Sequence, residues 1–297
     1  MNIQPTGQAL GAAVTGIDLR RPLSDADFAT ILRALTEHGV LCFPKQSIDA
    51  PELRDFSARF GSMQILRSGQ DATGVPEVSV LSNIRENGQP VGIPDAGQNW
   101  HTDMTYNQTP GYVNVLVAFE VPTRDGQTLG ATEFTNTARA YDELPDEVKT
   151  RLANATATHD LNFYWEFMRQ AKGSTRAPLS AAERAAHPPS RHPVFLTHPV
   201  SGRKVIYVNP GLTERIDGMS DTESQATLAM LFEHVLQPQY RYTHRWSVGD
   251  VLIWDHLSTW HNAVADYGPQ ERRLIKRCQV RADRIFDPAF VKAALAH

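Results

Sequence analysis

Short apolar segments separated by Gly and Pro constrain the fold of this chain more than any other feature. The chain contains 19 Gly and 19 Pro among 297 residues, and segments such as 113–119, 132–135 and 250–254 have the length and residue types of buried strands. They do not alternate regularly with helices, and no Gly-x-Gly-x-x-Gly motif is present, so a dinucleotide-binding α/β fold is not expected. We predict a mainly β fold with helical additions, in which two sheets form a sandwich or jelly roll. Further strand signals lie at residues 40–43, 78–81, 204–208, 240–246 and 273–280.

Capping signals place the helical additions. Ser24 offers a capping oxygen, an acid follows three residues later, and Gly39 lies just beyond the last apolar position, so a helix is expected between them. A helix at about residues 221–235 separates two groups of strand signals. Two more helices are expected at about residues 51–60 and 139–153, the second interrupted at Pro145.

Two segments rich in Gly and Pro are expected to be loops. Residues 84–99 lead into the most informative motif of the chain, and residues 170–193 form a long surface excursion. Loops of that length are commonly active-site lids or disordered segments. We therefore predict one domain over residues 1–297, with a lid-like insertion at about residues 155–200.

The composition excludes several classes of protein. The net charge is −4, whereas nucleic-acid binding needs a concentrated basic surface. No apolar run approaches the length of about 18 residues that a membrane span requires, and the first residues lack the layout of a signal peptide. The two cysteines, Cys42 and Cys278, form no Cys-x-x-Cys pair. This count excludes a disulfide framework and a zinc site of the cysteine type, and it predicts a reducing cytoplasm.

Trp100-His101-Thr102-Asp103 and the downstream pair Trp260-His261 predict a metal site. In an extended segment, His101 and Asp103 would project from the same face, about 6.6 Å apart along the strand. A third ligand must come from elsewhere, and His261 is the best candidate. Two imidazoles and one carboxylate on one side of an ion leave the opposite side open, which is typical of Fe(II) oxygenases.

The residues alone leave other interpretations open. His-x-Asp alone more often marks a hydrogen-bonded strand histidine than a ligand, and His256 lies close enough to His261 in sequence to compete with it. The three histidines of residues 187–198 each precede Pro and are expected to lie in an ordinary loop. Arg273 and Arg277 should share one face of a strand. They are either surface cations or a pair in which one guanidinium binds a dicarboxylate through two hydrogen bonds.

Taken together, these motifs resemble the taurine/phenoxyacetate dioxygenase family of Fe(II)- and 2-oxoglutarate-dependent oxygenases. The resemblance runs over about residues 8–281, in the order of the family. The matching segments are Trp100-His-Thr-Asp103, Gly126-Gln-Thr128, Ala140-Tyr-Asp-Glu-Leu-Pro145, His198-Pro-Val-Ser-Gly-Arg-Lys204, Trp246-Ser-Val-Gly-Asp250, Ile253-Trp-Asp255, His261 and Arg273-x-x-x-Arg277.

The resemblance implies a double-stranded β-helix core and a role for each motif residue. It assigns Fe(II) to His101, Asp103 and His261, and the distal carboxylate of the co-substrate 2-oxoglutarate to Thr128 and Arg273. It assigns an anionic group of the primary substrate to Arg277. The Asp103 carboxylate favours hydroxylation over halogenation.

The implied reaction consumes O2 and 2-oxoglutarate, releases succinate and CO2, and hydroxylates a small anionic substrate such as a phenoxyalkanoate, a sulfonate or another carboxylate. Hydroxylation of a carbon that bears a heteroatom would also cleave the substrate. No nucleic acid or membrane is expected as a partner, and the resemblance implies a homo-oligomer, either a dimer or a tetramer. The rival hypotheses are a non-catalytic metal- or ligand-binding β-barrel that acts as a sensor, and a zinc hydrolase.

The chain departs from the family pattern in three places. Glu271 adds one residue before the arginines, and His256 replaces the Asn of the usual Trp-Asp-Asn. The His and Tyr of taurine-preferring members are missing after Gly61, which leaves Gln64 or Arg67 as substitutes and argues against taurine as the substrate.

Overall fold

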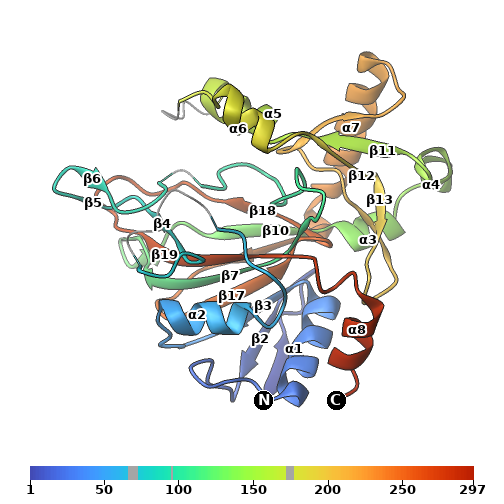
Figure 1. Ribbon diagram of the computed structural model, residues 1–297. Helices are drawn as coiled ribbons and strands as arrows, with labels where there is room; N and C mark the ends of the chain where they lie inside the picture. Colours follow the sequence, from blue (N-terminus) through green and yellow to red (C-terminus); the bar gives the residue numbers. More distant parts are fainter. Residues whose placement is uncertain (66–72, 95, 172–176) are drawn as a thin grey trace.

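The computed structural model describes residues 1–65, 73–94, 96–171 and 177–297. Two facing sheets form the centre of the protein, and helices cover it from outside (Figure 1). The major sheet has the strand order β1 (Asn2–Pro5), β2 (Ala12–Thr15), β3 (Val40–Phe43), β17 (Val251–Asp255), β7 (Gly111–Glu120), β19 (Leu274–Arg281) and β4 (Ser79–Ser82). The minor sheet has the order β16 (Arg241–His244), β10 (Thr132–Asn136) and β18 (Thr259–Ala263).

The central strands of the major sheet, β3, β17 and β7, are buried on both faces, and their side chains alternate between two cores. In β17, Leu252 and Trp254 point between the sheets, where they meet Phe134 of the minor sheet. Val251 and Ile253 point to the opposite face, toward the helices. This alternation follows from the two-residue repeat of a strand and explains why the strand segments read as continuous apolar runs.

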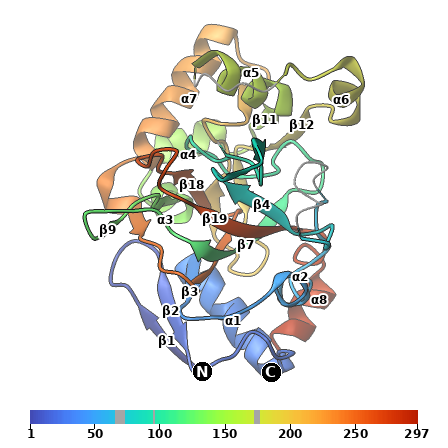
Figure 2. The same cartoon turned by 90° about the vertical axis from the view of Figure 1, so that its left-hand side faces the viewer.

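Helices α1 (Asp25–His38) and α2 (Ala50–Ser57) cover the outer face of the major sheet, with α8 (Pro288–Ala294) beside α1. The expected caps of α1 are confirmed. The Ser24 side chain accepts a hydrogen bond from the Asp27 N–H, and Gly39 adopts the left-handed conformation at φ 68°. Both chain termini lie at this end of the molecule (Figure 2).

A third layer packs at the far end of the minor sheet around a second apolar core. It contains the sheet β12 (Ser190–Pro193), β11 (Thr156–His159) and β15 (Thr213–Ile216), and the pair β13 (Phe195–Thr197) and β14 (Lys204–Ile206). Its helices are α3 (Thr137–Asp142), α4 (Asp146–Leu152), α5 (Leu161–Ala171), α6 (Ala181–Ala186) and α7 (Asp221–Val235), followed by the short 3-10 helix η1 (Pro238–Tyr240). No helix in the described part of the chain is both long enough and apolar enough to cross a membrane.

Most of the predicted elements are confirmed, and several boundaries or loops are corrected. The helix at residues 221–235 and the break at Pro145 are correct, but α2 ends at Ser57 rather than near residue 60. The expected loop at 84–99 contains a two-stranded ladder of β5 (Arg85–Glu86) and β6 (Gln89–Pro90), because two turn residues, Asn87 and Gly88, adopt positive φ between them.

The loop prediction was also wrong for parts of residues 187–198. His192 lies on β12 and contacts the Asn107 carbonyl at 3.0 Å, and the buried His198 Nε2 lies 2.7 Å from Asp255 Oδ2. The backbone N–H groups of Val200 and Ser201 donate to His198 Nδ1, so its other nitrogen carries the proton. These histidines serve separate hydrogen-bonding networks and do not converge on one ion.

Candidate metal centre

His101, Asp103 and His261 converge at the end of the space between the two sheets. One ligand atom from each side chain lies within 4.8 Å of the other two. His101 Nε2 lies 3.3 Å from Asp103 Oδ1, and His261 Nε2 lies 3.9 Å from Asp103 Oδ2. Both histidines are buried, and Asp103 is partly exposed. The three residues therefore offer two ring nitrogens and one carboxylate to a common point.

Backbone pairing brings the two histidines together. The His101 N–H donates to the His261 carbonyl at 3.0 Å, and the His261 N–H donates back at 2.8 Å. His261 lies on β18, opposite Phe134 of β10, so the minor sheet fixes its position. The assignment of His261 as the third ligand stays a prediction, whereas the strand at Thr259–Ala263 was not predicted.

The local geometry of residues 101–103 differs from the expected strand. Only His101 makes a strand bridge, after which the chain enters a turn with Met104 at φ 64°. His101 and Asp103 still meet, because the turn folds the carboxylate back toward the imidazole. The two side chains are close together, as expected, although the extended backbone assumed for them is not observed; that they bind a metal ion stays a prediction.

Two amide side chains hold one oxygen of Asp103. Asn114 Nδ2 donates to Asp103 Oδ2 at 2.7 Å, and Gln279 Nε2 donates to the same oxygen at 2.9 Å. The other oxygen, Oδ1, faces His101. Sequence analysis missed both amides, yet each had a signal. Asn114 is the one polar residue in the apolar run 113–119, and Gln279 lies two residues after Arg277, on the same face of β19.

The protonation states suit a cation. His101 Nδ1 lies 2.6 Å from the Asn99 carbonyl and donates to it, so Nε2 keeps its lone pair. Burial holds the pKa of His261 well below its usual value, and that ring is neutral. Burial acts to raise the pKa of Asp103, but the contact with His101 and the charge of Arg277 hold it well below its usual value. The site thus combines two ring nitrogens with an ionised carboxylate, the donor set that divalent iron binds.

His256 also reaches this region. Its Nε2 lies 3.9 Å from Asp103 Oδ2, and its Nδ1 lies 3.2 Å from Thr102 Oγ1, which itself donates to the His256 carbonyl at 2.8 Å. Burial lowers the pKa of His256 to about 4, so the ring is neutral. It is not a member of the cluster whose ligand atoms are mutually within 4.8 Å, and geometry favours His261.

Arg277 and Arg273 occupy different surroundings. Arg277 NH1 lies 3.7 Å from Asp103 Oδ2, and its buried Nε has no hydrogen-bond partner in the described part of the chain. Arg273 immediately precedes β19 and is 7% exposed, with its guanidinium carbon 5.8 Å from the ring centroid of Tyr267. Among the described residues no carboxylate lies within 4.0 Å of the Arg273 guanidinium, and burial lowers its pKa.

Thr128 lies on β9 (Gln127–Thr128), which pairs with β8 (Thr123–Arg124). No hydrogen bond joins its side chain to Arg273 within the described residues. The additional Glu271 forms two hydrogen bonds with Arg124 of β8, at 2.7 and 2.6 Å. This contact ties the hairpin that carries Thr128 to the loop that precedes Arg273.

Further polar and aromatic groups lie near the triad. The Gln64 amide donates to Tyr106 Oη at 3.1 Å and accepts from Asn107 at 3.2 Å. Tyr164 of α5 stacks against His101, with ring centroids 5.9 Å apart. The other suggested substitute, Arg67, lies outside the described residues.

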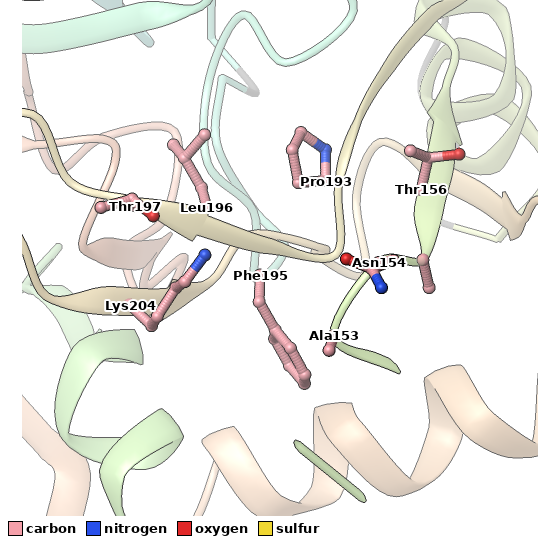
Figure 3. A pocket seen from close by; sticks show the side chains of 9 residues that line it. Ala153, Asn154, Thr156, Pro193, Phe195, Leu196, Thr197 and Lys204 are labelled. Atoms are coloured by element: carbon pink, nitrogen blue, oxygen red, sulfur yellow. The ribbon is translucent and has the colours of Figure 1, made fainter. Parts of the chain in front are cut away.

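A separate surface pocket carries one ionisable side chain, Lys204 (Figure 3). A single amine beside apolar and amide groups offers no metal site, so this pocket is not a candidate for the chemistry. Its lining comes from residues 153–156 and from Pro193, Phe195, Leu196, Thr197 and Lys204.

Comparisons with known proteins agree with this geometry. The family model described as taurine catabolism dioxygenase TauD, TfdA family, matches residues 2–279. Pentalenolactone F synthase of Streptomyces avermitilis is 33% identical, over 95% of this chain and 94% of that protein. The alpha-ketoglutarate-dependent 2,4-dichlorophenoxyacetate dioxygenase of Cupriavidus pinatubonensis is 30% identical, over 95% of this chain and 98% of that protein. The crystal structure of AAD-2 with Mn(II) and N-oxalylglycine superposes with a TM-score of 0.81 at 27% identity, over 95% of this chain and 97% of that one.

Proposed function

The chain belongs to the TauD, TfdA family of dioxygenases, and from this membership we propose that His101, Asp103 and His261 are the centre at which it hydroxylates a small anionic substrate. The enzyme is an Fe(II)- and 2-oxoglutarate-dependent dioxygenase. The observation that carries the assignment of residues is the meeting of three ligand atoms within 4.8 Å of one another. Fe(II), when bound, supplies a site at which the keto acid chelates and O2 is reduced.

The triad residues would hold Fe(II) through two ring nitrogens and one carboxylate oxygen. The amides of Asn114 and Gln279 both donate to Asp103 Oδ2, so Asp103 would offer Oδ1 to the ion. His101 Nδ1 donates to the Asn99 carbonyl, which leaves the lone pair of Nε2 available, and burial keeps the His261 ring neutral.

Arg273 binds the distal carboxylate of 2-oxoglutarate. Its guanidinium is buried and has no carboxylate neighbour in the described part of the chain, so an incoming dianion would supply the missing partner. We assign Thr128 to the same carboxylate as a hydroxyl donor, and the Glu271–Arg124 contact would position the hairpin that carries it. Holding the far end fixes the orientation of the reacting keto acid, which is where alignment contributes to rate.

Arg277 orients the anionic group of the primary substrate near the metal. Its Nε is buried without a partner among the described residues and its NH1 is 3.7 Å from Asp103, so the cation is held at the site and has donors free. The Gln64–Tyr106 pair borders the same region and would contact the remainder of the substrate. Phenoxyalkanoates, sulfonates and other carboxylates are the classes we propose.

We extend the proposal to the architecture and assembly. The two facing sheets support a double-stranded β-helix core, and α5, with Tyr164 against His101, supports a covering role for the insertion at residues 155–200 in a single domain. The free Cys42 and Cys278 fit a reducing cytoplasm. The homo-oligomer, a dimer or tetramer, is testable by analytical ultracentrifugation.

The test is a panel of phenoxyalkanoates, sulfonates, sulfate esters and other carboxylates, screened for O2 uptake and succinate formation that depend on both Fe(II) and 2-oxoglutarate. We expect at least one anionic compound of the panel to give both O2 uptake and succinate formation. We expect Asp103→Ala to abolish succinate formation without unfolding the protein. Binding of 2-oxoglutarate without turnover of any member would favour the sensor hypothesis. Turnover that is indifferent to O2 would favour a hydrolase.

A further inference from the structure

A second group of metal-ligand side chains lies between the sheets, away from the candidate centre. Cys42 of β3, His244 of β16 and Asp250, which precedes β17, each place one ligand atom within 4.8 Å of the other two. Strands β3 and β17 are neighbours in the major sheet, whereas β16 is the edge strand of the minor sheet. The group therefore bridges the two sheets where the edge of one faces the other.

His244 directs a nitrogen without a partner into this group. The side chain is 8% exposed, and its Nε2 lies 3.3 Å from Asp250 Oδ2 without the geometry of a hydrogen bond. The other nitrogen, Nδ1, lies 3.4 Å from Tyr242 Oη. A hydrogen bond at one ring nitrogen that orients the second toward a shared point is the usual arrangement of a ligating histidine.

The remaining two groups are also held in place. The Ser247 N–H donates to Asp250 Oδ2 at 2.9 Å, which fixes the carboxylate in the turn before β17. Cys42 alternates with Leu41 and Phe43, which pack on the helix side, so its thiol lies on the inner face with the core between the sheets. The His244 ring packs edge-on against Trp246, at 5.0 Å between centroids.

We propose that Cys42, His244 and Asp250 bind one zinc ion, which joins the edge of the minor sheet to the major sheet. Sulfur, imidazole nitrogen and carboxylate oxygen are the three ligand types that Zn(II) prefers, and a water reaching the partly exposed Cys42 completes four-coordination. Binding replaces the thiol proton, which passes to solvent, and no electron is transferred. This site has one cysteine, so it differs from the cysteine-type zinc site that the sequence excludes.

The inference is independent of the dioxygenase centre, and cobalt can distinguish the two sites. Metal-free full-length protein is titrated anaerobically with Co(II), and absorption is followed in the near ultraviolet. A thiolate bound to Co(II) gives a charge-transfer band there, whereas the His101, Asp103 and His261 centre has no sulfur and cannot give one. We expect the band in the wild type and in Cys278→Ser, which serves as the matched control, and its loss in Cys42→Ser.

Zinc stoichiometry by equilibrium dialysis gives a second readout. We expect two ions per chain in the wild type, one in Cys42→Ser and one in Asp103→Ala, with the cobalt band retained in Asp103→Ala. Absence of the band in the wild type would overturn the proposal without requiring any variant to fold. A band that survives Cys42→Ser, or a zinc count that Cys42→Ser leaves unchanged, would overturn it as well.

Discussion

Replacing Arg273 by Met should weaken 2-oxoglutarate binding without destabilising the free protein. Replacing a residue that stabilises the fold would lower the stability of the protein. The Arg273 guanidinium, however, is a cation in a residue that is only 7% exposed, and it has no carboxylate partner among the described residues. Burying such a charge costs folding free energy, which the contact with Tyr267 offsets only in part. Methionine fills a similar volume without the charge, so the unfolding free energy should stay constant or rise by about 1–2 kcal/mol.

The loss of affinity can be worked from the same contact. Two hydrogen bonds between a guanidinium and a carboxylate contribute about 1.5–3 kcal/mol each. Because the released carboxylate regains water, we take about 3–4 kcal/mol as the net loss, which corresponds to an increase of about 10²- to 10³-fold in the apparent KM for 2-oxoglutarate. At a concentration of 100 times the wild-type Kd, the ligand stabilises the wild type by about 2.7 kcal/mol and the variant by less than about 0.5 kcal/mol.

The assay is denaturant unfolding under anaerobic conditions, with and without 2-oxoglutarate, combined with initial rates in air. Arg272→Met is the matched control, because the neighbouring Arg272 is 58% exposed and already pairs with Glu120 at 2.7 Å. The control should leave the KM for 2-oxoglutarate within about twofold of the wild type. The reasoning is refuted if Arg273→Met lowers the stability of the free protein by more than about 1 kcal/mol, or raises only the KM for the primary substrate.

Three further predictions concern the triad and the core. Gln279→Met, which removes one donor to Asp103 Oδ2, should weaken Mn(II) binding about 10-fold in competition titrations; Lys276→Met, on the opposite face of β19, should not change it. His261→Asn should abolish Mn(II) binding while His256→Asn retains it, and the reverse result would show that His256 is the ligand. Burial lowers the pKa of His159 to about 3 from its usual value of 6.5. At a pH between these two values, the unfolded chain binds a proton at His159 that the folded protein does not. Stability should therefore fall by about 1.4 kcal/mol per unit as pH drops below 6.5, and His159→Phe should flatten that slope in denaturant unfolding at pH 5 and pH 7.

The elements that sequence analysis predicted best are those with strong local signals. α1 has a side-chain cap at Ser24 and a left-handed Gly39, so it begins and ends where local chemistry requires. α7 likewise begins at its own cap, Ser220. α5 was not predicted. It buries one residue, Met168, so its sequence carries no continuous buried face that would indicate a helix. β18 was not predicted either, because its strand conformation depends on pairing with β10, about 125 residues earlier in the chain.

The site follows the same division between local and distant information. The candidate donor atoms follow from residue types alone, so His101, Asp103 and His261 could be named before their backbone conformation was known. Their geometry comes from contacts that no local pattern contains, such as the bridge between His101 and His261. Asn114 and Gln279 lie on the two antiparallel neighbours β7 and β19, where they occupy directly paired positions. A donor pair that converges on one carboxylate oxygen is therefore a property of strand register, and shifting β19 by one residue would turn Gln279 away from Asp103.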